Sequence, residues 1–130
     1  LVNLARAEAR DCGAISFAAT QPVSWNCQLM EAAKVHSVDM ANNDFFNHSG
    51  SDGLQVSHRV TATGYDWRAV GENIAAGYPN ESAAVAALLD SPGHCENIMN
   101  PDYQEFGSAS EFTNRRVFPS YWTQVFATEF

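Results

Sequence analysis

The order in which helical and extended patterns follow one another limits the folds open to this chain. Helices are predicted over 2–11, 25–42 and 81–89, with a helical turn or two over 54–63 and a further helix beginning at Pro92. Strands are predicted over 67–76, 105–113 and 118–128, the last two joined by a turn at Asn114, Arg115 and Arg116. Because this order is not a regular strand–helix–strand repeat, it predicts an α+β fold.

The periodicity inside two of these segments predicts which side chains share a face. In 25–42, the positions expected on the apolar face of the helix recur at three- and four-residue intervals, at Leu29, Ala33, His36 and Met40. In 118–128, alternation places one group of side chains together, namely Tyr121, Thr123, Val125 and Ala127. The opposite face then carries Trp122, Gln124 and Phe126. Each face of this strand is therefore expected to meet a different part of the fold.

The length and the net charge limit the classes of protein to which this chain can belong. The 130 residues fit a single domain, 1–130, with a real core. The formal net charge of -8 and the absence of a cluster of Lys and Arg exclude a phosphate-binding surface, so nucleic acid is not an expected partner. No apolar run approaches the roughly 20 residues of a transmembrane helix. The chain begins at Leu1 with a helical pattern already under way, so we expect that something was removed upstream.

Three cysteines allow one disulfide and leave one thiol over. A bridge from Cys12 to Cys27 would close a local loop rich in turn residues. A bridge from Cys12 to Cys95 would join distant parts of the chain and constrain the unfolded state more. A fully reduced cytosolic protein is the third possibility.

Candidate chemistry lies in separate blocks of the sequence. Phe45-Phe46-Asn47-His48 ends a long amphipathic segment, and Gly71-Glu72-Asn73-Ile74-Ala75-Ala76-Gly77 follows it. Downstream are Ser91-Pro92-Gly93-His94-Cys95-Glu96-Asn97-Ile98-Met99-Asn100-Pro101 and Tyr121-Trp122-Thr123-Gln124-Val125-Phe126. A carboxylate and two imidazoles thus stand beside apolar residues that could hold them in place, as a metal site or an acid–base pair requires. The candidates are His48, Glu72 and His94.

In their order and spacing these blocks resemble the CAP superfamily, which comprises cysteine-rich secretory proteins, insect venom antigen 5 and plant pathogenesis-related proteins. The bacterial branch with SCP domains is the most similar. The resemblance implies a three-layer α-β-α sandwich with a small antiparallel sheet between helices, and a secreted or periplasmic protein. It also favours Cys12–Cys95 as the disulfide, with Cys27 as an unpaired and mostly buried thiol.

The resemblance further implies a cleft in which two His and two Glu hold a divalent metal. His48 and Glu72 match two members of that set. Tyr121, expected to line the cleft, stands where the second His is expected, and the second Glu falls near Ser91. His94 partly compensates, because two imidazoles and one carboxylate are a ligand set that zinc accepts.

Structural roles for the same residues stay open. Glu72 could pair with His48 or accept backbone N–H groups, and His94 could cap its helix. His36, on the apolar face of its helix, is expected to be a hydrogen-bonded core histidine, and His58 a surface residue.

Three classes of function remain. The first is a monomeric binding module for an extracellular lipid, peptide or other small ligand. The second is a metal-assisted hydrolase with Glu72 as general base, and the third is an interaction scaffold. Tyr121 in place of an imidazole favours binding over catalysis.

Overall fold

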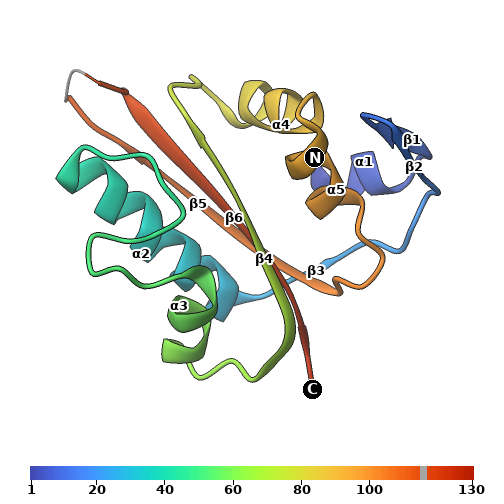
Figure 1. Ribbon diagram of the computed structural model, residues 1–130, viewed down its shortest axis with the longest axis horizontal. Helices are drawn as coiled ribbons and strands as arrows, with labels where there is room; N and C mark the ends of the chain where they lie inside the picture. Colours follow the sequence, from blue (N-terminus) through green and yellow to red (C-terminus); the bar gives the residue numbers. More distant parts are fainter. Residues whose placement is uncertain (115–116) are drawn as a thin grey trace.

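The computed structural model describes residues 1–114 and 117–130, and in it helices lie on both sides of a sheet (Figure 1). The helices are α1 (Val2–Arg6), α2 (Cys27–Asn43), α3 (Val56–Ala62), α4 (Glu81–Leu89) and α5 (Pro92–Met99). The strands are β1 (Arg10–Cys12), β2 (Ile15–Phe17), β3 (Ser24–Trp25), β4 (Trp67–Ala76), β5 (Glu105–Phe112) and β6 (Ser120–Glu129). Of the turn predicted at 114–116, residues 115–116 lie outside the described residues.

The larger sheet has the strand order β3-β5-β6-β4, with β3 parallel to β5 and the other pairs antiparallel. Helices α2 and α3 cover one face, while α1, α4 and α5 lie on the other (Figure 1). Strand β4 forms one edge of this sheet, between the two helical layers. The predicted α+β class and α-β-α sandwich are therefore confirmed.

Each face of β6 contributes to a different core cluster, as its alternation predicts. Val125 packs with Leu29 and Ala33 of α2, whereas Phe126 packs with Ile98 and Met99 of α5. Helix α2 also approaches β5 closely, because a Cβ at Gly107 would clash with the backbone of Met30. This packing fixes α2 against the sheet.

The first segment differs from its prediction. A helix over 2–11 is wrong, since α1 ends at Arg6 and β1 pairs with β2 in an antiparallel hairpin. The hairpin turns at Gly13, whose φ of 62° is in the region that glycine adopts without strain. The chain also turns because Arg6 is fully buried and donates to backbone carbonyls remote in sequence. The periodicity of the sequence does not predict contacts between residues so far apart in the chain.

The disulfide joins Cys12 of β1 to Cys95 of α5, across 83 residues, so the predicted pairing is confirmed. Cys27 is the free cysteine, and it is exposed at the first residue of α2, so its expected burial is wrong. Its position explains the exposure, because Cys27 precedes Leu29, the first buried residue of α2. In the described part of the chain, no helix is long and apolar enough to cross a membrane.

Candidate functional site

Glu72 lies on β4 with its side chain on the face covered by α2 and α3, and only 2% of that side chain is exposed. Its Oε2 accepts a hydrogen bond from Arg59 Nη2 at 2.7 Å. Its Oε1 lies 2.9 Å from His48 Nδ1 and 3.9 Å from His36 Nε2. The carboxylate is therefore surrounded by one cation and two imidazoles, as a buried carboxylate requires.

Arg59 connects this carboxylate to the loop that carries His48. Its Nη1 donates to Leu54 O at 2.9 Å, and its Nη2 also donates to His48 O at 3.1 Å. Arg59 is not among the site residues predicted from the sequence, although one signal was available. A motif carboxylate next to apolar residues needs a buried cation, and Arg59 stands beside Val60 in a short helical segment.

His36 is fully buried on α2, and its Nε2 donates to the carbonyl of Asn47 at 2.8 Å. The predicted hydrogen-bonded core histidine is confirmed. Because a carbonyl only accepts, Nε2 carries the proton in the neutral ring, and Nδ1 has no hydrogen-bond partner among the described residues. Burial lowers the pKa of His36, and the charge of Glu72 opposes that shift.

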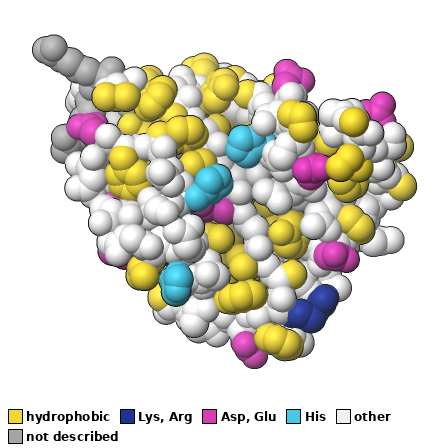
Figure 2. Space-filling view, in the orientation of Figure 1, with side chains coloured by type: hydrophobic (Ala, Val, Ile, Leu, Met, Phe, Trp, Pro, Cys, Tyr) yellow, Lys and Arg dark blue, Asp and Glu magenta, His cyan; other side chains and the backbone are white. Residues whose placement is uncertain are grey.

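His94 approaches the site from the other helical layer. It lies near the start of α5, where its Nδ1 is 2.8 Å from Ser91 Oγ. Burial lowers the pKa of His94, and the charge of His48 lowers it further. Figure 2 shows histidine side chains beside an acidic one around a hollow on this face of the molecule. By contrast, His58 is exposed on α3, as predicted.

A cavity of about 250 Å³ adjoins His94. Most of its lining is apolar and comes from β4, α4 and the flanking loops: Phe46, Ile74, Ala76, Tyr78, Ala87 and Phe118. Tyr121 is fully buried in a cluster with Ile74, one of these lining residues. This cavity thus combines mainly apolar walls with the polar side chains of Ser91 and His94.

Two asparagines hold α5 against β4. Asn97 Nδ2 donates to Glu72 O at 3.2 Å and to Asn73 Oδ1 at 2.8 Å. Asn73 Nδ2 donates to His94 O at 3.1 Å. The helix that carries His94 is thereby fixed to the strand that carries Glu72.

The cleft does not fit a zinc ion well. Among the described residues, no three His, Cys, Asp or Glu side chains lie close enough together to hold a metal. The guanidinium of Arg59 already supplies a positive charge at Glu72 Oε2, where a metal would compete with it. We therefore derive no metal chemistry from this cleft.

Known proteins resemble this chain in both sequence and structure. The chain is 33% identical over 104 residues to the uncharacterized membrane protein YlbC of Bacillus subtilis (strain 168), and 28% identical over 106 residues to the uncharacterized protein YkwD of the same organism. It covers 28% and 39% of these two proteins, so it spans about a third of their length.

Two solved structures have the same fold. One is an extracellular protein containing an SCP domain from Bacillus anthracis, with a TM-score of 0.75 and 27% identity over 85% of this chain and 35% of that chain. The other is an outer surface protein from Borrelia burgdorferi, with a TM-score of 0.75, 21% identity, and coverage of 85% of this chain and 80% of that chain.

The family model of the cysteine-rich secretory proteins matches residues 1–126, nearly the whole described fold. With the three-layer architecture and the bacterial structures that share it, this match shows that the chain belongs to the cysteine-rich secretory protein (CAP) family, in its bacterial SCP-domain branch.

Proposed function

We propose that this domain is a binding module whose cleft holds an extracellular ligand with an apolar segment and a polar end, such as a lipid or a peptide. The main support for this proposal is that the buried carboxylate is already paired, whereas the nearby cavity is apolar. Glu72 is buried and paired with Arg59 at 2.7 Å, whereas the cavity of about 250 Å³ that His94 lines is mainly apolar. A site of this kind favours apolar contact, with a few polar groups that orient the ligand.

Two imidazoles supply those polar groups. The His48 side chain is 51% exposed, so it can reach a ligand while its Nδ1 faces Glu72. His94 lines the cavity itself, and its lowered pKa favours a neutral ring that can donate or accept a hydrogen bond. In this proposal His48 and His94 bind the polar end, and the aromatic side chains of Phe46 and Phe118 contact the apolar segment.

Catalysis fits the same geometry less well. A general base must reach the proton that it removes. The two oxygens of Glu72 instead face His48 and Arg59 inside the protein. A hydrolase that used Glu72 with a metal would first have to displace Arg59, which costs a buried ion pair.

An extracellular location accords with this function. Similar structures carry the descriptions extracellular protein and outer surface protein, and disulfides persist in oxidising compartments. We therefore propose a secreted or periplasmic domain. The ligand site is built within one chain, so a monomer suffices.

A substitution that fills the cavity tests the proposal. Ala87→Trp places an indole in the cavity from α4, while Ala86→Trp puts the same group on an exposed neighbour that does not line it. Dodecanoate and an apolar hexapeptide serve as separate probes in calorimetric titrations. We expect at least one probe to bind the unmodified domain, and Ala87→Trp to weaken that binding by about tenfold or more. Ala86→Trp should leave it unchanged.

Failure of both probes to bind would contradict the proposal. So would equal affinity of the unmodified domain and of Ala87→Trp, because the ligand would then lie elsewhere. Melting temperatures of both tryptophan variants show whether each is folded.

A further inference from the structure

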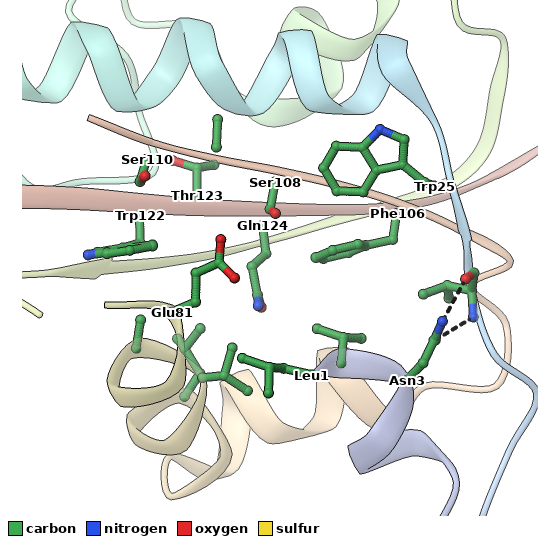
Figure 3. Close-up of a pocket in the computed structure, with 16 residues that line it drawn as sticks. Leu1, Asn3, Trp25, Glu81, Phe106, Ser108, Ser110, Trp122, Thr123 and Gln124 are labelled. Carbon is green, nitrogen blue, oxygen red and sulfur yellow. Dashed lines mark hydrogen bonds between the residues drawn. The ribbon is translucent and has the colours of Figure 1, made fainter. Parts of the chain in front are cut away.

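A second cavity, of about 420 Å³, lies on the opposite face of the sheet from the Glu72 side chain (Figure 3). Its sheet wall comes from paired residues of β5 and β6, whose side chains share a face: Phe106, Ser108, Ser110, Trp122 and Gln124. Helix α4 and the start of α1 form the other wall, with Glu81, Val85, Leu88, Leu1 and Val2. We call this cavity the aromatic groove. Its volume is in the range of sites for small ligands.

The aromatic side chains of the groove are held in place. Trp122 Nε1 donates to Tyr78 O and to Ser120 Oγ, both at 3.1 Å, and its ring meets Phe112 edge-on at 5.8 Å. The Phe106 ring lies 5.9 Å from that of Trp25 and 5.0 Å from that of Phe126. Rings fixed in this way lose little freedom when a ligand binds.

The side chains that line the groove carry charge of one sign. Among the described residues that line it, Glu81 carries the only charged side chain. Figure 3 shows the carboxylate of Glu81 pointing across the groove toward the sheet, near Trp122 and Gln124. Within the described part of the chain, this carboxylate makes no ion pair, and the hydroxyls of Ser108 and Ser110 make no hydrogen bond. The amino group of Leu1, which also lines the groove, is not within ion-pair distance of this carboxylate. The groove therefore offers free acceptors and aromatic faces without a cationic side chain to balance them.

We propose that the aromatic groove binds an organic cation with an apolar body, such as an alkylammonium or arylammonium compound. The ammonium group donates to the Glu81 carboxylate and to the serine hydroxyls. The faces of Trp122 and Phe106 attract the same charge, and Val85 and Leu88 contact the apolar body. An anionic ligand would meet Glu81 with no cation beside it. This site shares only Leu88 with the cavity of the proposed function, and the inference does not depend on that function.

Glu81 also has a structural role, and the test must separate the two. It is the first residue of α4, where a negative side chain complements the helix dipole. That role affects stability alone. A ligand site also predicts a preference among ligands of one shape and different charge.

Three eight-carbon probes differ only in their head group: 1-octylammonium, 1-octanol and octanoate. Calorimetric titration of the 130-residue chain should give about tenfold tighter binding of octylammonium than of octanol, with octanoate weakest. Glu81→Gln should bring octylammonium to the affinity of octanol and leave octanol itself unchanged. The indole N–H resonance of Trp122 should shift on titration with octylammonium.

Glu31→Gln is the matched control, since it removes one negative charge from an exposed position on α2, across the sheet from the groove. It should keep the full preference for the ammonium probe. The proposal is overturned if octylammonium does not bind, if octanoate binds as tightly, or if Glu81→Gln keeps the preference. Equal loss of preference in both variants would also overturn it, because it would reflect net charge rather than the groove.

Discussion

At the scale of single residues, two opposite charges meet in a nearly dry site. The side chains of Glu72 and Arg59 are 2% and 7% exposed, and their closest atoms are 2.7 Å apart. Taking either charge out of water is costly, and the pair persists because each partner satisfies the other. Arg59 also holds the carbonyls of Leu54 and His48, so the same guanidinium fixes the loop that carries His48.

Removing this cation should therefore affect the fold strongly. Arg59→Met leaves Glu72 buried without its charged partner, and we expect a loss of about 3–5 kcal/mol in the free energy of unfolding, measured by urea denaturation. Arg68→Met removes the same charge from an exposed position on β4 and should cost less than about 0.5 kcal/mol. Similar losses in the two variants would mean that the Glu72 pair adds little to stability.

The sequence could supply part of this site. The motif context pointed to His48 and Glu72, and their side chains lie 2.9 Å apart. The residues around Arg59 indicated a buried cation at most, because its pairing with Glu72 depends on how α3 packs beside β4. His36 was expected in the core, yet its distance of 3.9 Å from Glu72 follows from the packing of α2 on the sheet.

At the scale of elements, Arg6 anchors α1 to the rest of the molecule. Its Nη1 donates to Ile98 O and Asn100 O at 2.8 and 2.9 Å, its Nη2 to Tyr103 O at 3.1 Å, and its Nε to Gln21 O at 2.8 Å. Burial lowers the pKa of Arg6. A helix of five residues is too short to be stable alone, so this anchor holds it.

Loss of the anchor should release α1. Arg6→Met leaves several buried carbonyls without a donor and should cost about 3 kcal/mol or more, since bonds to a charged group contribute roughly 1.5–3 kcal/mol each. Arg6→Lys keeps the charge but lacks the fork of donors, so it should recover only part of the loss. Lys34→Met, at an exposed site on α2, is the control for charge. A change below about 1 kcal/mol in Arg6→Met would contradict this role.

Local signals were sufficient for some elements and not for others. Strand β4 and helix α4 have the bounds predicted from the sequence, because caps and punctuating glycines lie at their ends. The hairpin of β1 and β2 was missed, because each strand has three residues and its position depends on Arg6, Gly13 and the disulfide. The position of this hairpin depends on contacts between residues far apart in the chain, and the periodicity of the sequence does not reveal such contacts.

At the scale of the whole molecule, the disulfide connects the N-terminal segment to the layer that carries His94. Cys12 belongs to β1, Cys95 follows His94 directly on α5, and both cysteines are buried. The bridge spans 83 residues, more than half of the chain. Cross-links over long loops restrict the unfolded chain more than local ones do.

Replacing both bridge cysteines, in the double variant Cys12→Ser/Cys95→Ser, should lower the free energy of unfolding by about 2–5 kcal/mol. Chemical denaturation of the oxidised domain and of this variant measures the difference, and a reducing agent should destabilise only the former. Cys27→Ser is the matched control, because its thiol is exposed and free, and it should change stability by less than about 0.5 kcal/mol. If the reducing agent left the unmodified domain as stable as before, the bridge would not contribute to folding, and the asparagine contacts of α5 would have to hold His94 at the cleft without it.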